Sequence, residues 1–226
     1  MGISYRLPST AVVRTGAERA TLIRRTYSLV FASVLVTMAG AAFGLSQPRV
    51  MEAVARHPII TALLMFAPLL MAMRARSSFP ANIGFTFLFT FVEGIFISPL
   101  LFMYGQSQPG VITQAALLTG SAFGVLTLYA WFSRRDFSAW GSFFTVGLFV
   151  LIGTSLLNLF FQNATASLWI AGATVLVFSG LLIFDTWRIR NVFGPDDYVM
   201  AAVTIYLDLL NMFLAILSLL GGNRRN

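Results

Sequence analysis

The sequence predicts an all-α integral membrane protein with seven transmembrane helices. Of its 226 residues, 58% are apolar and only 10% are charged, which leaves too few polar side chains for a water-exposed surface. Seven apolar stretches are separated by charged or turn-forming residues, and almost every stretch is long enough to cross a hydrocarbon core of roughly 30 Å. These stretches take up nearly the whole chain, so we expect one compact helical bundle.

The helices follow one another with short breaks that contain residues typical of turns. The predicted spans are 27–45, 58–73, 83–103, 111–132, 140–161, 168–187 and 198–220. The breaks are Gln47-Pro48-Arg49, Arg74 to Pro80, Gly105 to Gly110, Arg134-Arg135-Asp136, Gln162 to Thr165 and Gly194 to Asp197. Residues 1–26 are then a cytoplasmic, partly disordered N-terminal tail, 27–221 form a single seven-helix membrane domain, and 222–226 are a C-terminal tail.

The distribution of charge places the N-terminus in the cytoplasm. All fifteen basic residues are arginines, and this orientation puts eleven of them inside and four outside, as the positive-inside rule requires. The inside set is Arg6, Arg14, Arg19, Arg24, Arg25, Arg74, Arg76, Arg134, Arg135, Arg188 and Arg190. A re-entrant last segment would also bring Arg224 and Arg225 inside, so the side of the C-terminus stays open. In a bacterium the protein would lie in the inner membrane.

Composition excludes several classes of function. The chain has no cysteine, which rules out disulfides, thiolate catalysis and cysteine-ligated metals. Its net charge of +7 does not predict nucleic-acid binding, because the arginines lie between apolar segments and set the orientation. The N-terminal segment lacks a short apolar core and a small-residue cleavage site, so we expect no cleaved signal peptide.

Two aspartates within the last two apolar helices, Asp185 and Asp208, are the strongest candidates for function. A carboxylate at membrane depth is costly and usually faces a cavity, an ion route or a partner. Both lie about a dozen residues from the middle of the Gly194 to Asp197 break, so an antiparallel hairpin would bring them to the same depth, up to ~17 Å from the turn. Whether they face each other depends on helix rotation, which spacing does not determine.

Two further charged residues are candidates. The second span covers only ~22 Å from Ile59 to Met73, so Arg74 at its end can reach inward and pair with one aspartate, or it can be an ordinary topology arginine at the interface. Glu93 near the middle of the third span has two interpretations: an extension of a polar route towards the outer side, or a protonated carboxyl bonded to a neighbouring helix.

Small residues predict close helix contacts in two places. Gly40 and Gly44 in the first span, and Gly120 and Gly124 in the fourth, both follow the small-xxx-small pattern of membrane helix interfaces. Ordinary glycine abundance in membrane helices explains the pattern equally well.

Several segments together resemble the Bax inhibitor family, the transmembrane Bax inhibitor motif proteins. The resemblance covers nearly the whole chain. It is carried by Phe184-Asp185-Thr186, Tyr206 to Leu214, Leu217 to Gly221, Arg25 to Ser28, Phe85 to Gly94 with Ser98-Pro99, and Arg135 to Ser138.

The resemblance implies a seven-helix fold in which two three-helix groups surround a central C-terminal helix. It also implies a pH-sensitive calcium leak, as in the bacterial branch of the family. The family's paired aspartates match Asp185 and Asp208 by motif, and its latch arginine matches Arg74. Calcium is then the transported ion, weakly held by the two aspartates, and no cofactor or enzymatic activity is expected.

A physical mechanism follows from the two aspartates alone. Two adjacent carboxylates in a low dielectric share a proton because double ionisation is costly, so the pair is a pH sensor. Calcium prefers oxygen ligands, and two carboxylates make a weak, releasable site that suits conduction.

Other functions compete with the leak. Intramembrane aspartyl proteases carry Gly-x-Gly before the second acid, whereas Tyr206-Leu207 precedes Asp208 here, and the rhomboid serine arrangement needs a membrane histidine. The main alternative is a non-conducting regulator that binds another membrane protein, such as a membrane protease. A proton-coupled transporter is a smaller possibility, because no substrate-sized polar site is evident.

Overall fold

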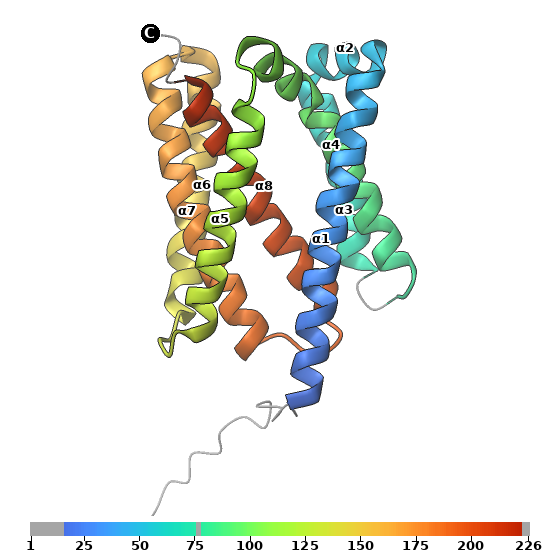
Figure 1. Ribbon diagram of the computed structural model, residues 1–226, viewed down its shortest axis with the longest axis vertical. Coiled ribbons are helices and arrows are strands. Elements are labelled where there is room, and N and C mark those ends of the chain that lie inside the picture. The colour runs from blue at the N-terminus through green and yellow to red at the C-terminus, as the bar shows by residue number, and fades with distance from the viewer. Residues whose placement is uncertain (1–15, 76–77, 223–226) are drawn as a thin grey trace, which may run out of the picture.

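The computed structural model describes residues 16–75 and 78–222, which fold into helices without a strand (Figure 1). The helices are α1 (Gly16–Ser46), α2 (Pro48–Arg56), α3 (Pro58–Arg74), α4 (Ala81–Ser107), α5 (Val111–Phe132), α6 (Ser138–Phe161), α7 (Ala164–Asn191) and α8 (Tyr198–Gly222). The all-helical class predicted from the sequence is therefore confirmed for the described residues.

The number of spans is six to seven, so the predicted seven is not confirmed. In the described part of the chain, six helices are long and apolar enough to cross a membrane, and a seventh span requires α2 and α3 to act together across a bend of 99°. Hydropathy did not indicate α2, because the polar residues of this helix resemble a break between spans. Proline is tolerated in the first turn of a helix, and an exposed ion pair joins Glu52 to Arg56 within α2.

Helix ends differ from the predicted spans where polar residues extend a helix beyond the apolar core. α1 begins at Gly16 instead of residue 27, so residues 16–26 of the predicted tail are helical. Residues 1–15 of that tail and residues 223–226 of the C-terminal tail lie outside the described residues. α7 begins at Ala164 because the Asn163 side chain accepts a hydrogen bond of 3.0 Å from the Ala166 amide, a typical N-cap.

α8 runs obliquely through the middle of the bundle, between α1, α3 and α4 on one side and α5, α6 and α7 on the other (Figure 1). It contacts α1, α3, α4, α5 and α7. It also contains many of the least exposed side chains, including Ala201, Ile205, Met212 and Leu217. α6 is the peripheral helix, since it packs against α7 and no other described helix.

The α1–α4 interface is a close backbone contact made possible by glycine. A Cβ atom on Gly40 would collide with the backbone of Phe91, and one on Gly94 would collide with the backbone of Thr37. By contrast, no atom lies within 4 Å of the Cβ position at Gly120 or Gly124. The first small-residue motif is therefore a packing contact within the chain, and the second is not.

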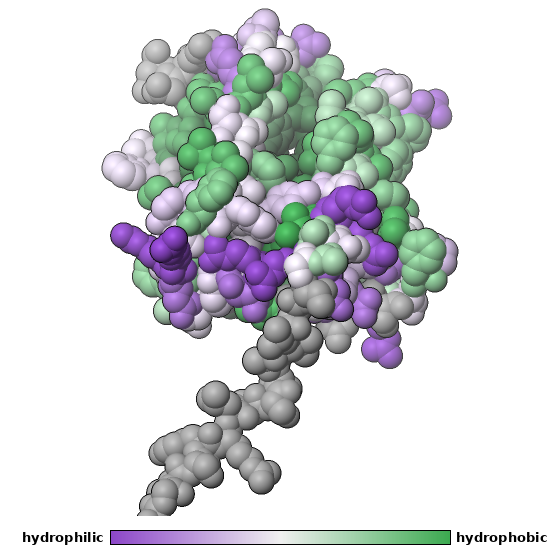
Figure 2. All heavy atoms as spheres, turned by 60° about the horizontal axis from the view of Figure 1, so that its bottom comes forward, coloured by the Kyte–Doolittle hydropathy of each residue, from purple (hydrophilic) through white to green (hydrophobic). Residues whose placement is uncertain are grey.

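One end of the bundle carries the start of α1 and the α7–α8 turn, and hydrophilic side chains gather there below a more hydrophobic band (Figure 2). The Gly194 amide donates to Asp197 Oδ2 at 2.7 Å, which closes the turn. Arg190 donates to the carbonyls of Trp131 and Ser133 at 2.6 and 2.9 Å. These carbonyls belong to the last turn of α5 and its end, where helix carbonyls lack partners, so Arg190 ties α5 to α7.

Candidate functional site

Asp185 of α7 and Asp208 of α8 lie buried at the interface between the two helices, with exposed fractions of 6% and 4%. The two carboxyl groups lie close enough to be electrostatically coupled across this interface. Ionised carboxylates are acceptors only, so a hydrogen bond between them requires a shared proton. The sequence spacing did not determine the rotation of the two helices. In the structure, this rotation turns both residues towards each other.

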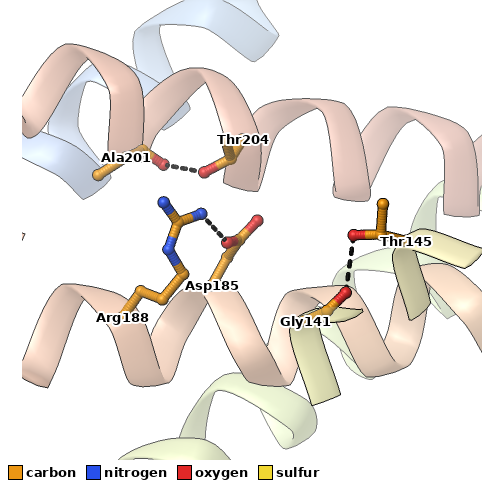
Figure 3. Close-up of polar contacts among 6 residues, drawn as sticks. All are labelled: Gly141, Thr145, Asp185, Arg188, Ala201 and Thr204. Atoms are coloured by element: carbon orange, nitrogen blue, oxygen red, sulfur yellow. Dashed lines mark hydrogen bonds and ion pairs between the residues drawn. The ribbon is translucent and has the colours of Figure 1, made fainter. Parts of the chain in front are cut away.

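Arg188 is the charged partner of this aspartate pair. Its Nη1 donates to Asp185 Oδ1 at 2.8 Å, and Figure 3 shows the guanidinium pointing at that carboxylate. The guanidinium also lies 4.3 Å from the ring centroid of Phe193 and 5.4 Å from that of Phe184. An i,i+3 pair on one helix face and two aromatic rings therefore determine where this arginine lies.

The two aspartates have unequal surroundings. Asp185 has Arg188 on its own helix, and Thr204 of α8 lies across the interface from it, with its hydroxyl donating to the Ala201 carbonyl at 3.2 Å (Figure 3). Asp208 Oδ2 is buried without a hydrogen-bond partner in the part of the chain that the structure describes. Among the described residues, Asp208 therefore lacks the ion pair that Asp185 makes.

The structure does not bring Arg74 to the aspartate pair. Arg74 ends α3 with an exposed side chain, and within residues 16–75 and 78–222 it forms no ion pair. Arg188 was not predicted as a partner of the pair, because it was counted among the arginines that set the orientation. The available signal was its i,i+3 spacing from Asp185.

Glu93 belongs to a second buried polar cluster, formed by α1, α4 and α8. It is only 6% exposed and is hydrogen-bonded to the Tyr206 hydroxyl. The Tyr206 hydroxyl in turn lies 2.6 Å from Thr37 Oγ1. Of the two interpretations of Glu93, this geometry corresponds to the hydrogen bond with a neighbouring helix. The sequence analysis assigned no role to Tyr206 or Thr37, whose residue types are common in membrane helices.

The two clusters lie on opposite faces of α8. Tyr206 and Asp208 are two residues apart, which is about 200° around a helix. Tyr206 contacts α1 and α4 through Thr37 and Glu93, whereas Asp208 contacts Asp185 of α7. The central helix is thus joined to each group of outer helices by a contact that contains a carboxyl group.

A family model for the inhibitor of apoptosis-promoting Bax1 matches residues 19–225. The chain belongs to the Bax inhibitor family. Its relatives include a Vibrio cholerae protein described as an uncharacterized membrane protein, which is 34% identical over 227 aligned positions covering 96% of each chain.

Eukaryotic and viral members of the Bax inhibitor family are also similar. The Bax inhibitor 1 of Schizosaccharomyces pombe is 31% identical over 212 positions, covering 92% of this chain and 79% of that protein. The Golgi anti-apoptotic protein of vaccinia virus strain Lister is 32% identical over 205 positions, covering 89% of this chain and 85% of the viral protein. With the apolar helices, these matches identify an integral membrane protein of this family.

The described residues offer calcium only a small set of ligands. They contain no group of three or more histidine, cysteine or acidic side chains that could hold a metal ion. The aspartate pair therefore provides at most two carboxyl ligands, fewer than the six to eight oxygens that calcium usually takes.

Proposed function

We propose that this Bax inhibitor family protein is a pH-sensitive calcium leak channel gated by the aspartate pair. The observation that carries the proposal is the contact between Asp185 and Asp208 at the buried α7–α8 interface. Gain or loss of the shared proton changes the charge between the two helices and so biases the position of α8. The protein acts by conduction and not by catalysis.

Arg188 takes the role that the sequence analysis assigned to Arg74. With the shared proton present, the pair carries one negative charge, which the guanidinium balances through its 2.8 Å bond to Asp185. Without the proton, two adjacent carboxylates face one arginine, and the repulsion between them is no longer balanced. A calcium ion supplies the positive charge that this state lacks.

The first experiment measures calcium entry into liposomes that contain the purified protein and a calcium dye, from pH ~6 to ~8. We expect Asp185→Asn and Asp208→Asn each to abolish the pH dependence of the flux. Glu52→Gln is the matched control, because its carboxylate is exposed on α2, and it should behave as wild type. Flux with unchanged pH dependence in both aspartate variants would contradict the gating role.

The alternative is a non-conducting regulator that binds another membrane protein, such as a membrane protease. The position of α6 favours it, because this helix packs against α7 alone and exposes Phe143, Phe149 and Phe160. The anti-apoptotic names of the relatives are compatible with either function. Co-purification of a membrane protease with the protein, combined with no flux from the pure protein, would favour the regulator.

A further inference from the structure

A polar groove lies between α6, α7 and α8, at the end of the bundle away from the α7–α8 turn. Its volume is about 300 Å³. The polar side chains that line it are Ser155, Asn158, Ser167, Thr174, Asn211 and Ser218. No other helix contributes to its lining, and the aspartate pair is not part of it.

The groove begins at the end of the bundle and extends into the apolar region. Asn158 lies in the last turn of α6 and Ser167 in the first turn of α7. Asn211 is the innermost lining residue on α8 and Ser218 is the outermost, which are seven residues or ~10 Å apart along the helix. The lining on α8 therefore covers at most about a third of a hydrocarbon core of roughly 30 Å.

The helix faces that line the groove also carry the aspartate pair. On α8, Asn211 and Ser218 follow Asp208 by three and ten residues, close to one and three turns of a helix. On α7, Thr174 precedes Asp185 by eleven residues, again about three turns. One helical turn thus separates the inner end of the groove, at Asn211, from the buried Asp208.

The hydrogen bonds around the groove leave oxygen atoms available. Thr174 donates to the Ile170 carbonyl at 2.8 Å, Ser167 to the Asn163 carbonyl at 3.1 Å, and the Asn211 amide nitrogen to the Leu207 carbonyl at 2.8 Å. These donors are used by the backbone, and two groove oxygens already accept hydrogen bonds: Ser167 Oγ from the Asn158 side chain at 2.7 Å, and Asn158 Oδ1 from the Asn163 amide at 3.2 Å. A hydroxyl or amide oxygen has two lone pairs, so each of these atoms keeps at least one for a further ligand. Oxygen atoms of this kind are the ligands that hard cations such as calcium prefer.

A polar surface of this depth is unfavourable against lipid. Polar groups that face hydrocarbon lose their hydrogen bonds to water, and in membrane proteins such groups usually face a protein interior or a water-filled cavity. Lipid is the ordinary environment of the neighbouring α6 surface, where Val150 and Leu156 are exposed. The oxygen atoms of the groove differ from these hydrocarbon side chains, because their remaining lone pairs can accept hydrogen bonds from water.

We propose that this groove is a water-filled access site for a hydrated divalent cation, leading from one face of the membrane to the aspartate pair. The inference rests on the proposed leak function and assigns the half of the ion route that lies beyond Asp208. Asn211 is the last oxygen ligand before the pair. The one-turn step between Asn211 and Asp208 is the closed part of the route in this structure, because Asp208 is only 4% exposed.

The absence of cysteine makes a direct test available. Single variants Ser155→Cys, Asn211→Cys and Ser218→Cys are reconstituted in liposomes and exposed to a charged, membrane-impermeant methanethiosulfonate reagent on both faces. A thiol reacts as the thiolate, which needs water. We expect the groove positions to react at least about tenfold faster than Val150→Cys and Leu156→Cys, two lipid-facing controls. Equal rates at groove and control positions would overturn the proposal.

Calcium flux separates this inference from the proposed function. In a conducting protein, we expect modification of Asn211→Cys with a positively charged reagent to reduce flux several-fold, and modification of Leu156→Cys to leave it unchanged. If the groove thiols are labelled fast but no variant conducts calcium, the groove is water-filled and the protein is not a leak channel. The opposite result is flux that depends on Asp185 while the groove thiols react no faster than the controls. It would contradict the proposed access site and leave the leak function supported.

Discussion

Arg188 forms an ion pair with Asp185 on the same helix, α7. It is therefore the first residue to test. Arg188→Gln removes the 2.8 Å ion pair and leaves a buried carboxylate with fewer donors. We expect a loss of about 1.5–3 kcal/mol of stability, the range for hydrogen bonds to charged groups, and a changed pH profile of calcium flux.

Arg74→Gln is the matched variant, because it removes the same charge from an exposed position at the end of α3. The structure predicts wild-type stability and flux for it. Thermal unfolding in detergent and the liposome assay measure both quantities. A raised resting leak in Arg74→Gln with a normal Arg188→Gln would restore Arg74 as the latch.

The Tyr206 hydroxyl gives a second prediction at the scale of single residues. Tyr206→Phe removes the partner of both Glu93 and Thr37, so a buried carboxyl group loses a hydrogen bond. We expect a stability loss of about 1–3 kcal/mol, and a smaller loss when Glu93→Gln is already present. Tyr129→Phe, at an exposed tyrosine, is the control. Equal and additive losses would show that Tyr206 and Glu93 are not coupled.

At the scale of elements, glycine determines how closely α1 and α4 approach each other. Gly40→Ala and Gly94→Ala place a methyl group against a neighbouring backbone, which cannot move aside as a flexible side chain can. We expect each variant to lose at least about 1–3 kcal/mol, the usual cost of overpacking, measured as thermal unfolding in detergent. Gly120→Ala and Gly124→Ala have open space at the Cβ position and should keep wild-type stability.

The sequence predicted elements well where apolar residues alone define them. The bounds of α5, Val111–Phe132, coincide with the predicted span, because charged or turn-forming residues flank it on both sides. The polar start of α1 and the short α2 were missed, since hydropathy does not detect a helix whose residues are polar. The spacing of Asp185 and Asp208 predicted their common depth, but only the packing of α8 reveals that they touch.

Which arginine would contact the pair was the least predictable part of the site. Arg74 and Arg188 both lie at the cytoplasmic ends of predicted spans, and hydropathy does not distinguish them. The choice depends on the direction of each side chain and on the rings of Phe184 and Phe193 beside Arg188. Those contacts form between α7 and the following loop and exist only in the folded chain.

For the whole molecule, the arrangement of charged ends predicts an orientation. The end with the start of α1 and the α7–α8 turn carries exposed Arg19, Arg24, Arg134 and Arg135, so the positive-inside rule places it in the cytoplasm. In bacterial cells that express the single variants Gly16→Cys and Ser46→Cys, an impermeant thiol reagent added outside should label position 46 and spare position 16. The reverse pattern would invert the proposed topology.

The opposed contacts on α8 have a consequence for how sharply the protein responds to acidity. Asp208 contacts α7 from one face of α8, and Tyr206 contacts α1 and α4 from the other. The helix can shift only when both contacts break. Two protonation events at separate carboxyl groups would then act together, and the flux would follow pH more steeply than a single titration permits. We expect a Hill slope above one in the wild type and a slope of about one in Glu93→Gln, in which only the aspartate pair responds to pH. In Asp185→Asn the pair cannot release α8 by losing its proton, so titration of Glu93 alone should not change the flux.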